Sequence, residues 1–232
     1  MIAFLAAFVL LCASLYGCFF PSAVLTRQAL TAIAPARDVR PFVLGLVGFA
    51  STMRNQLRCQ SATLHTEGLL PQDLRDQLVH ARSAPTLVLL WLGHWLSACR
   101  RDQMLEPICA HKMENSLDGL ALALGSCERI ANTPLPFAYS VILHRSVFLY
   151  CGLLPFGLVD SIGWMTPLVV TFVSYTFFAL EALSDEIENP FGLDANDLAL
   201  DAMVSSIDAS LREMLGEVPP PVPRPDANFV LT

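Results

Sequence analysis

An uncharged stretch of 20 residues, Ser161–Leu180, constrains this chain more than any other feature of its sequence. As an α-helix it would extend about 30 Å, which is roughly the hydrocarbon thickness of a bilayer. A second apolar run, Ser146–Val159, precedes it, and the single charge of Asp160 separates the two. This earlier run is shorter and needs Phe137–Leu143 to complete a crossing. The two runs therefore predict a helical hairpin that enters a membrane and returns.

Two ionisable residues fall near membrane depth in this hairpin. His144 and Arg145 lie between Phe137–Leu143 and the apolar run that starts at Ser146. Lipid does not solvate such side chains, so they must face protein or water. We expect Arg145 either to neutralise an acid across the hairpin or to line a vestibule that attracts anions.

The composition agrees with a membrane or interface role and argues against two other classes. Hydrophobic residues make up 54% of the 232 residues and charged residues only 15%, whereas soluble domains carry about 25% charged residues. The surplus apolar surface requires lipid or a large subunit interface. The basic residues are scattered without interleaved aromatics, which argues against a nucleic-acid partner. Neither G-x-S-x-G, H-E-x-x-H nor a P-loop occurs, so we do not expect an enzyme.

Charge is distributed unevenly along the chain. Eleven of the 14 basic residues lie between Arg27 and Arg129, and ten of the 21 acids follow Leu183. Basic segments that flank apolar spans tend to remain in the cytoplasm. We therefore predict that residues 21–136 are cytoplasmic and that the short turn Asp160–Thr166 lies outside.

Prolines predict where the helices of the remaining chain begin and end, because proline suits a first helical turn and interrupts a helix interior. The expected helices are Ser22–Ala34, Pro41–Gln60, Pro71–Ala81, Pro85–Arg101, Pro107–Ile130 and Leu198–Leu215. Pro41–Gln60 has apolar residues at helical spacing on one face, namely Phe42, Leu46, Phe49, Met53 and Leu57. Its two arginines, Arg54 and Arg58, come near its end, where cations suit the helix dipole.

The cysteine pattern indicates thiols rather than cross-links. The chain has seven cysteines, an odd number, and none is arranged as C-x-x-C. Most have apolar neighbours. We expect reduced, buried thiols rather than a disulfide framework or a zinc site.

Several motifs in one order resemble the bestrophin family, bacterial branch. They are E-R-I-A-N-T-P-L-P-F-A-Y (128–139), Arg145, L-Y-C-G-L-L-P-F-G-L-V (149–159), T-P-L-V (166–169) and N-P-F-G-L-D-A-N-D-L (189–198). Weaker similarity extends back to about Ser22. The resemblance implies an all-α membrane protein with transmembrane helices and a cytosolic helical bundle.

This resemblance also implies a function and a location. Family members are homopentameric ion channels with one axial pore, so we expect passive transport of chloride or monovalent cations across a bacterial inner membrane, by a multi-pass protein. The pore's cytosolic constriction is implied at Ile108, where five apolar side chains would form a ring. A ring of this kind can gate by dewetting. The alternative is a non-conducting membrane scaffold or a truncated channel subunit without a formed pore neck.

The N-terminal segment departs from the family. The helix that lines the pore neck is not recognisable in Met1–Phe20, which is uncharged and long enough to span a membrane. We expect a retained, divergent transmembrane helix that replaces the neck, or else a cleaved or lipidated leader. A truncated or mis-started gene would also explain the difference.

The acidic turn after the hairpin is the one place where a metal is suggested. Eukaryotic bestrophins bind calcium at the corresponding cluster, and Asp194 and Asp197 match ligand positions. Ala195 and Asn196 interrupt the acidic run, and two oxygen ligands do not fill a calcium shell. Capping of the following helix by Asp194 or Asp197 is the alternative. We otherwise expect no cofactor.

The resulting organisation has five segments. They are an N-terminal transmembrane helix (1–20), a cytosolic helical region (21–136), a transmembrane hairpin (137–183), a cytosolic acidic turn and helix (184–217) and a Pro-rich flexible tail (218–232).

Overall fold

The computed structural model describes residues 20–34, 37–133, 137–188, 190–193 and 197–221, with the backbone alone for 137–140 and 184–188. The chain divides into two units. The described residues of 1–132 and 198–232 form a bundle, and those of 133–197 form a hairpin. Every regular element among the described residues is a helix, as predicted. The expected N-terminal membrane helix, apart from residue 20, and residues 222–232 of the tail lie outside the described residues.

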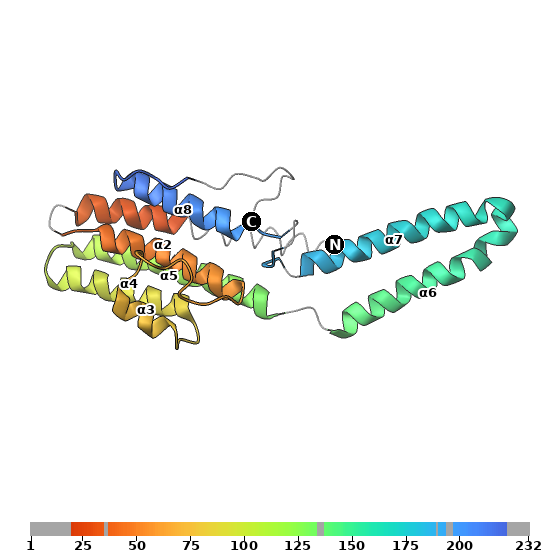
Figure 1. Ribbon diagram of the computed structural model, residues 1–232, viewed down its shortest axis with the longest axis horizontal. Helices are drawn as coiled ribbons and strands as arrows, with labels where there is room; N and C mark the ends of the chain where they lie inside the picture. Colours follow the sequence, from red (N-terminus) through yellow and green to blue (C-terminus); the bar gives the residue numbers. More distant parts are fainter. Residues whose placement is uncertain (1–19, 35–36, 134–136, 189, 194–196, 222–232) are drawn as a thin grey trace. The chain divides into compact units, whose positions relative to one another are not determined.

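One helix, α2 (Arg40–Leu57), is the centre of the bundle. It packs against α4 (Ala84–Arg101), α5 (Pro107–Asn132) and α8 (Leu200–Met214), and α3 (Gln72–Leu78) packs on α4. Figure 1 shows α8 on one side of α2 and the pair α4 and α5 on the other. Residues 20–32 form a further helix of the bundle, drawn in red, which ends next to the fully buried Ile33.

The apolar face predicted for α2 is buried, and the structure buries nearly all of its other sides as well. Fifteen of its 18 residues are buried, including Val43, Leu44 and Val47 as well as the predicted face. The reason lies in its composition, because residues 42–50 are apolar without interruption and the polar Thr52, Arg54 and Asn55 find partners inside the protein. Two glycines of α2 allow neighbouring side chains to approach closely. A methyl group on Gly45 would lie 2.6 Å from Cζ3 of Trp91, and one on Gly48 would lie 2.5 Å from Cδ2 of Leu70.

Prolines mark the helix starts as the sequence predicts. Pro71 is the residue immediately before α3, Pro85 is the second residue of α4, and Pro107 is the first residue of α5. At the start of a helix a backbone N–H group has no helical carbonyl to bond, so a proline there removes no helical hydrogen bond. The helix starts are therefore fixed locally, before any tertiary contact is considered.

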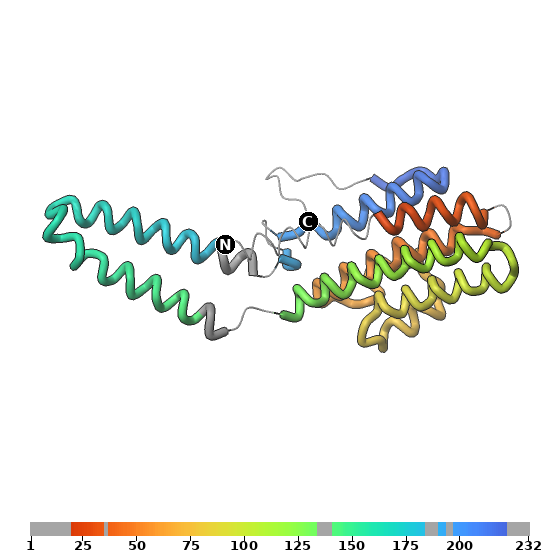
Figure 2. The backbone as a smooth tube through the Cα atoms, turned by 180° about the vertical axis from the view of Figure 1, so that it is seen from behind, coloured from red at the N-terminus to blue at the C-terminus, as the bar shows by residue number. Residues whose placement is uncertain are grey.

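The hairpin consists of α6 (Phe137–Ile162), the short 3-10 turn η1 (Gly163–Met165) and α7 (Thr166–Glu188). α6 and α7 run side by side in opposite directions (Figures 1 and 2). Gly163 has a positive φ of 56°, a conformation that glycine adopts without a steric cost. The turn therefore falls within the predicted segment Asp160–Thr166. We call the η1 end of the hairpin its tip, and the end where α6 begins and α7 ends its base.

Apolar side chains of the hairpin point outward. Val141–Leu183 is long and apolar enough to cross a membrane, and it is the only such stretch among the described residues. The large exposed apolar side chains of α6 are Ile142, Leu143, Phe148, Leu149, Tyr150, Leu153, Phe156, Val159 and Ile162. On α7 they are Leu168, Phe172, Tyr175, Phe177, Phe178, Leu180 and Leu183. Contiguous apolar surface of this extent is not left in water by a soluble protein.

Candidate functional site

A polar pair joins the two helices of the hairpin near its base. Nδ1 of His144 on α6 hydrogen-bonds with Oε1 of Glu181 on α7. The Glu181 side chain is only 14% exposed, whereas that of His144 is 60% exposed. The Phe148 ring lies 4.6 Å from the His144 ring and 5.0 Å from the Phe178 ring, between centroids. Glu181 therefore has an imidazole partner on α6, and the ring of that partner packs against Phe148.

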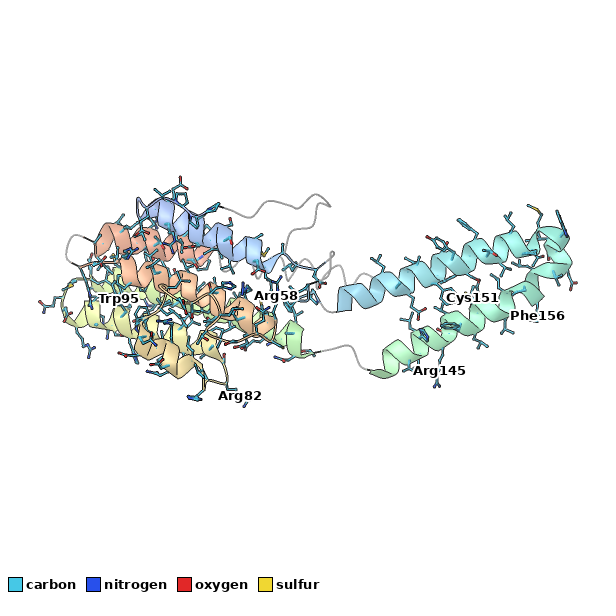
Figure 3. The ribbon with its side chains drawn as sticks, viewed as in Figure 1. Arg58, Arg82, Trp95, Arg145, Cys151 and Phe156 are labelled. Carbon is cyan, nitrogen blue, oxygen red and sulfur yellow. The ribbon has the colours of Figure 1, made fainter. Side chains whose placement is uncertain are left out.

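Arg145, the neighbour of His144, lies on the exposed surface of α6 (Figure 3). Among the described residues, no carboxylate is within ion-pair distance of its guanidinium, and Glu181 pairs with His144 instead. Of the two roles expected for Arg145, the neutralisation of an acid across the hairpin therefore does not involve Glu181. The charge of Arg145 faces outward from the hairpin surface.

Ile108 lies at the start of α5 and projects outward. It is the second residue of that helix, and 65% of its side chain is exposed. Asn115 and Leu122, 7 and 14 residues later, are also exposed and lie on the same helix face. Leu122 is 72% exposed. The implied constriction residue is thus one end of an exposed stripe along α5, available to another copy of the chain or to a pore.

A buried ion cluster links α2 to α8, and sequence reasoning missed it. Asp201 Oδ1 accepts from Nη1 of Arg54, and Oδ2 accepts from Nη1 of Arg58 at 2.5 Å. The two arginine side chains are 9% and 4% exposed, and that of Asp201 is 33% exposed. Arg54 also donates to Oδ1 of Asn55 at 2.8 Å. A partly shielded carboxylate between two buried guanidinium groups fixes the start of α8 against α2.

The expected role of Arg54 and Arg58 at the helix dipole is therefore incomplete, because their main partner is a distant carboxylate. One signal was available in the sequence. Arg54 lies within a helix that consists largely of apolar residues, Arg58 directly follows it, and a buried charge requires a partner. What the sequence did not contain was the identity of that partner, which lies more than 140 positions later.

At the acidic turn, Asp194 lies outside the described residues, and Asp197 is half-buried and already engaged in an interaction. Within the part of the chain that the structure describes, no three histidine, cysteine or acidic side chains group as a metal site. The prediction that Asp197 is the N-cap of the following helix is wrong, because α8 begins at Leu200 and its N-cap residue is Ala199. Asp201 instead supplies the negative charge of the first turn, where it suits the helix dipole.

The described cysteines are free thiols, and most of them are buried. Cys99, Cys127 and Cys151 are buried, as expected. Cys59 is exposed and departs from that expectation. Burial, together with the neighbouring Glu128 carboxylate, raises the pKa of Cys127 to about 11. Burial also raises the pKa of Cys99, against the opposing effect of Arg37. Such thiols remain protonated and unreactive near neutral pH.

Comparison with known proteins identifies the group to which these features belong. Residues 18–213 match the family described as Bacterial/Fungal Bestrophin protein. A voltage-dependent anion channel-forming protein of Salmonella typhi is 41% identical over 207 residues, which is 89% of this chain and 68% of that protein. A voltage-dependent anion channel-forming protein of Ralstonia nicotianae is 42% identical over 196 residues, which is 83% of this chain and 64% of that protein.

Solved structures agree with these sequence matches. A crystal structure of a bacterial bestrophin homolog from Klebsiella pneumoniae superposes with a TM-score of 0.87 at 37% identity. The match covers 94% of this chain and 81% of that one. The fold described above is therefore that of known membrane proteins.

Proposed function

Because this chain belongs to the bacterial and fungal bestrophin family, we propose that it is a subunit of an anion-conducting membrane channel. The observation that carries the proposal is the family match over residues 18–213, with relatives at 41% and 42% identity that are named voltage-dependent anion channel-forming proteins. The names of these relatives favour anions over the monovalent cations that the sequence had left open. Conduction is passive, so no catalytic group is required.

The membrane location is supported by the family and by the outward-facing apolar surface of the hairpin. In the proposed topology α6 and α7 each cross the bilayer, with the tip outside and the base at the cytoplasmic face. The uneven distribution of basic residues supports a cytoplasmic bundle. We therefore propose that residues 137–183 lie in the membrane and that residues 21–136 and 184–217 lie on the cytoplasmic side.

We propose that five copies surround one axial pathway and that Ile108 from each copy forms its cytosolic constriction. The exposed position of Ile108 at the start of α5 supports this role, because an isoleucine packed inside its own subunit could not line a pore. A ring of isoleucines would exclude water when narrow and admit ions when wide. The pathway is incomplete in a single subunit.

Flux measurements test the proposal directly. The purified chain would be reconstituted into liposomes and planar bilayers, and chloride efflux and reversal potential would be measured across a KCl gradient. We expect chloride flux and a reversal potential close to that of chloride, with Ile108→Thr raising the conductance because it wets the ring. Val79→Thr, at an exposed site on the bundle, is the matched control and should leave the conductance unchanged.

Two results would overturn the proposal. A potassium-directed reversal potential would replace the anion channel by a cation channel. Membrane-inserted protein that carries no current at any voltage would instead support the non-conducting scaffold.

A further inference from the structure

We propose that Arg145 binds the phosphate of an anionic lipid in the cytoplasmic leaflet, at the base of the hairpin. The inference rests on the proposed placement of α6 and α7 in the bilayer. It assigns a ligand to Arg145, a basic residue of the hairpin surface that has no carboxylate within ion-pair distance among the described residues.

The depth of Arg145 follows from its distance to the tip. Arg145 and Asp160 are 15 residues apart on α6, which is about 22 Å along a helix. The hydrocarbon layer is about 30 Å thick. If Asp160 lies at the outer interface, the backbone of Arg145 therefore lies several ångströms inside the cytoplasmic edge of the hydrocarbon.

The side chain of Arg145 is directed so that it can leave the hydrocarbon. Cα–Cβ bonds of an α-helix tilt towards its N-terminus, which for α6 is at the base. The arginine stem reaches roughly one helical turn, about 5 Å, and can lie along apolar surface while its charged end reaches the interface. The guanidinium therefore arrives within about 3 Å of the cytoplasmic edge of the hydrocarbon, where the phosphate of an adjoining lipid can approach it.

The surroundings of Arg145 match an amphiphile rather than a free anion. Ile142 and Leu149, one turn before and after it on the same face, are 68% and 65% exposed. The acid nearest in depth, Glu181, is already paired with His144 and is mostly covered. A single cation at the edge of an apolar stripe offers a phosphate contact and an acyl-chain contact together, which is the chemistry of an anionic phospholipid.

Trp164 supports the same placement from the other end of the hairpin. It lies in η1 at the tip and is 94% exposed. Tryptophan is enriched at membrane interfaces, where its ring sits at the headgroup level. An aromatic anchor at the tip and an arginine near the base would hold the hairpin between the two interfaces.

Lipid retention tests the inference on the full chain. The purified protein would be reconstituted into nanodiscs of phosphatidylcholine with a minor fraction of phosphatidylglycerol. Native mass spectrometry would then release it into the gas phase and count the phosphatidylglycerol molecules that it retains. The variants are Arg145→Gln, Arg145→Lys and, as matched control, Arg82→Gln. Arg82 is an exposed arginine of the bundle, labelled in Figure 3.

We expect Arg145→Gln to lower phosphatidylglycerol retention about fivefold, the effect of one basic residue at an anionic surface, while Arg145→Lys retains most of it. Arg82→Gln should match the wild type. Unchanged retention in Arg145→Gln would overturn the inference. Loss of subunit association in Arg145→Gln that is equal in nanodiscs with and without phosphatidylglycerol would also overturn it, because Arg145 would then bind a neighbouring copy.

Flotation with vesicles separates the failure of this inference from that of the proposed function. A chain that does not float with phosphatidylcholine vesicles contradicts the membrane placement itself. A chain that floats normally, but whose phosphatidylglycerol retention is independent of Arg145, contradicts the lipid site alone.

Discussion

Two helices of this chain, α2 and α6, consist largely of apolar residues, yet their burial is opposite. Fifteen of the 18 residues of α2 are buried, whereas the described side chains of α6 are buried only at Val147 and Cys151. α2 is surrounded by helices that are distant in the sequence, whereas α6 packs against α7 and η1 among the described elements. The sequence of an apolar helix therefore indicates that the helix requires a nonpolar environment. It does not indicate whether protein or lipid supplies that environment.

Polar groups within the two helices follow the same division. In α2, Thr52 bonds to the carbonyl of Phe49 at 2.9 Å, and Asn55 donates to the carbonyl of Leu64 at 2.7 Å. In α6, His144 pairs across the hairpin with Glu181. Buried polar groups are satisfied inside the protein, and hairpin charges gather near the ends, as a bilayer requires.

Removing a large side chain should affect the two helices very differently. Leu46→Ala in α2 removes a fully buried leucine, so we expect the free energy of unfolding to fall by about 3 kcal/mol. Leu153→Ala in α6 should cost less than about 1 kcal/mol, because lipid or detergent chains are as apolar as leucine and refill the space. Denaturant unfolding in detergent micelles measures both. Equal losses would mean that protein, not lipid, covers Leu153.

Adding a charge should reverse the order of sensitivity between hairpin and bundle surface. Leu153→Asp places a carboxylate near the middle of the membrane, at a cost of about 3 kcal/mol to insertion. Val79→Asp, at a site of the bundle that is 63% exposed, should have little effect. The fraction of protein that remains in membranes after carbonate extraction reports the difference. Normal insertion of Leu153→Asp would contradict a lipid-facing position.

The ion cluster of the bundle should be sensitive in proportion to its burial. Asp201→Asn removes the carboxylate between two buried arginines, and we expect a loss of about 2 kcal/mol, lower than for a fully buried pair because Asp201 is one-third exposed. Asp208→Asn on the same helix breaks a pair with Arg212 four residues away and should cost about 0.5 kcal/mol. Unfolding in denaturant compares them. A result that ranks Asp208 above Asp201 would contradict the assigned role of the cluster.

The smallest effect is expected at Cys127, through its pKa of about 11. An unfolded chain ionises this thiol near pH 8.5, whereas the folded chain keeps it protonated. Its contribution to stability is therefore complete below about pH 8.5 and is lost as the pH rises towards about 11. Alkylation at pH 8 should be at least about tenfold slower at Cys127 than at the exposed Cys59. Similar rates at the two cysteines would show that Cys127 is accessible.

Much of the fold could be predicted because its signals are local. Prolines 71, 85 and 107 mark helix starts, and the length of Ser161–Leu180 predicts a span. The pairing of Arg54 and Arg58 with Asp201 could not be predicted, since it depends on how α8 packs on α2. The start of α8 was misplaced by two residues for the same reason, because Asp201 binds arginines while Asp197 does not cap the helix.

The candidate site was less predictable than the fold. Ile108 was assigned by resemblance, and its exposure agrees with a pore role without testing it, because a pore requires several copies. The His144–Glu181 pair depends on the register of α6 against α7, which the hairpin length alone does not determine. Arg145 was expected to neutralise an acid or to line a vestibule; Glu181 pairs with His144 instead, and the vestibule role stays a prediction because a vestibule requires several copies.

The most direct test of the account is the environment of the hairpin surface in a bilayer. Nitroxide labels would be attached at Leu153→Cys on α6 and Leu168→Cys on α7, in a chain whose native cysteines are replaced and which is reconstituted into vesicles. We predict strong broadening by oxygen and little by a water-soluble nickel complex at both sites, with the opposite pattern at Val79→Cys. Strong nickel broadening at residues 153 and 168 would contradict the placement of α6 and α7 in lipid.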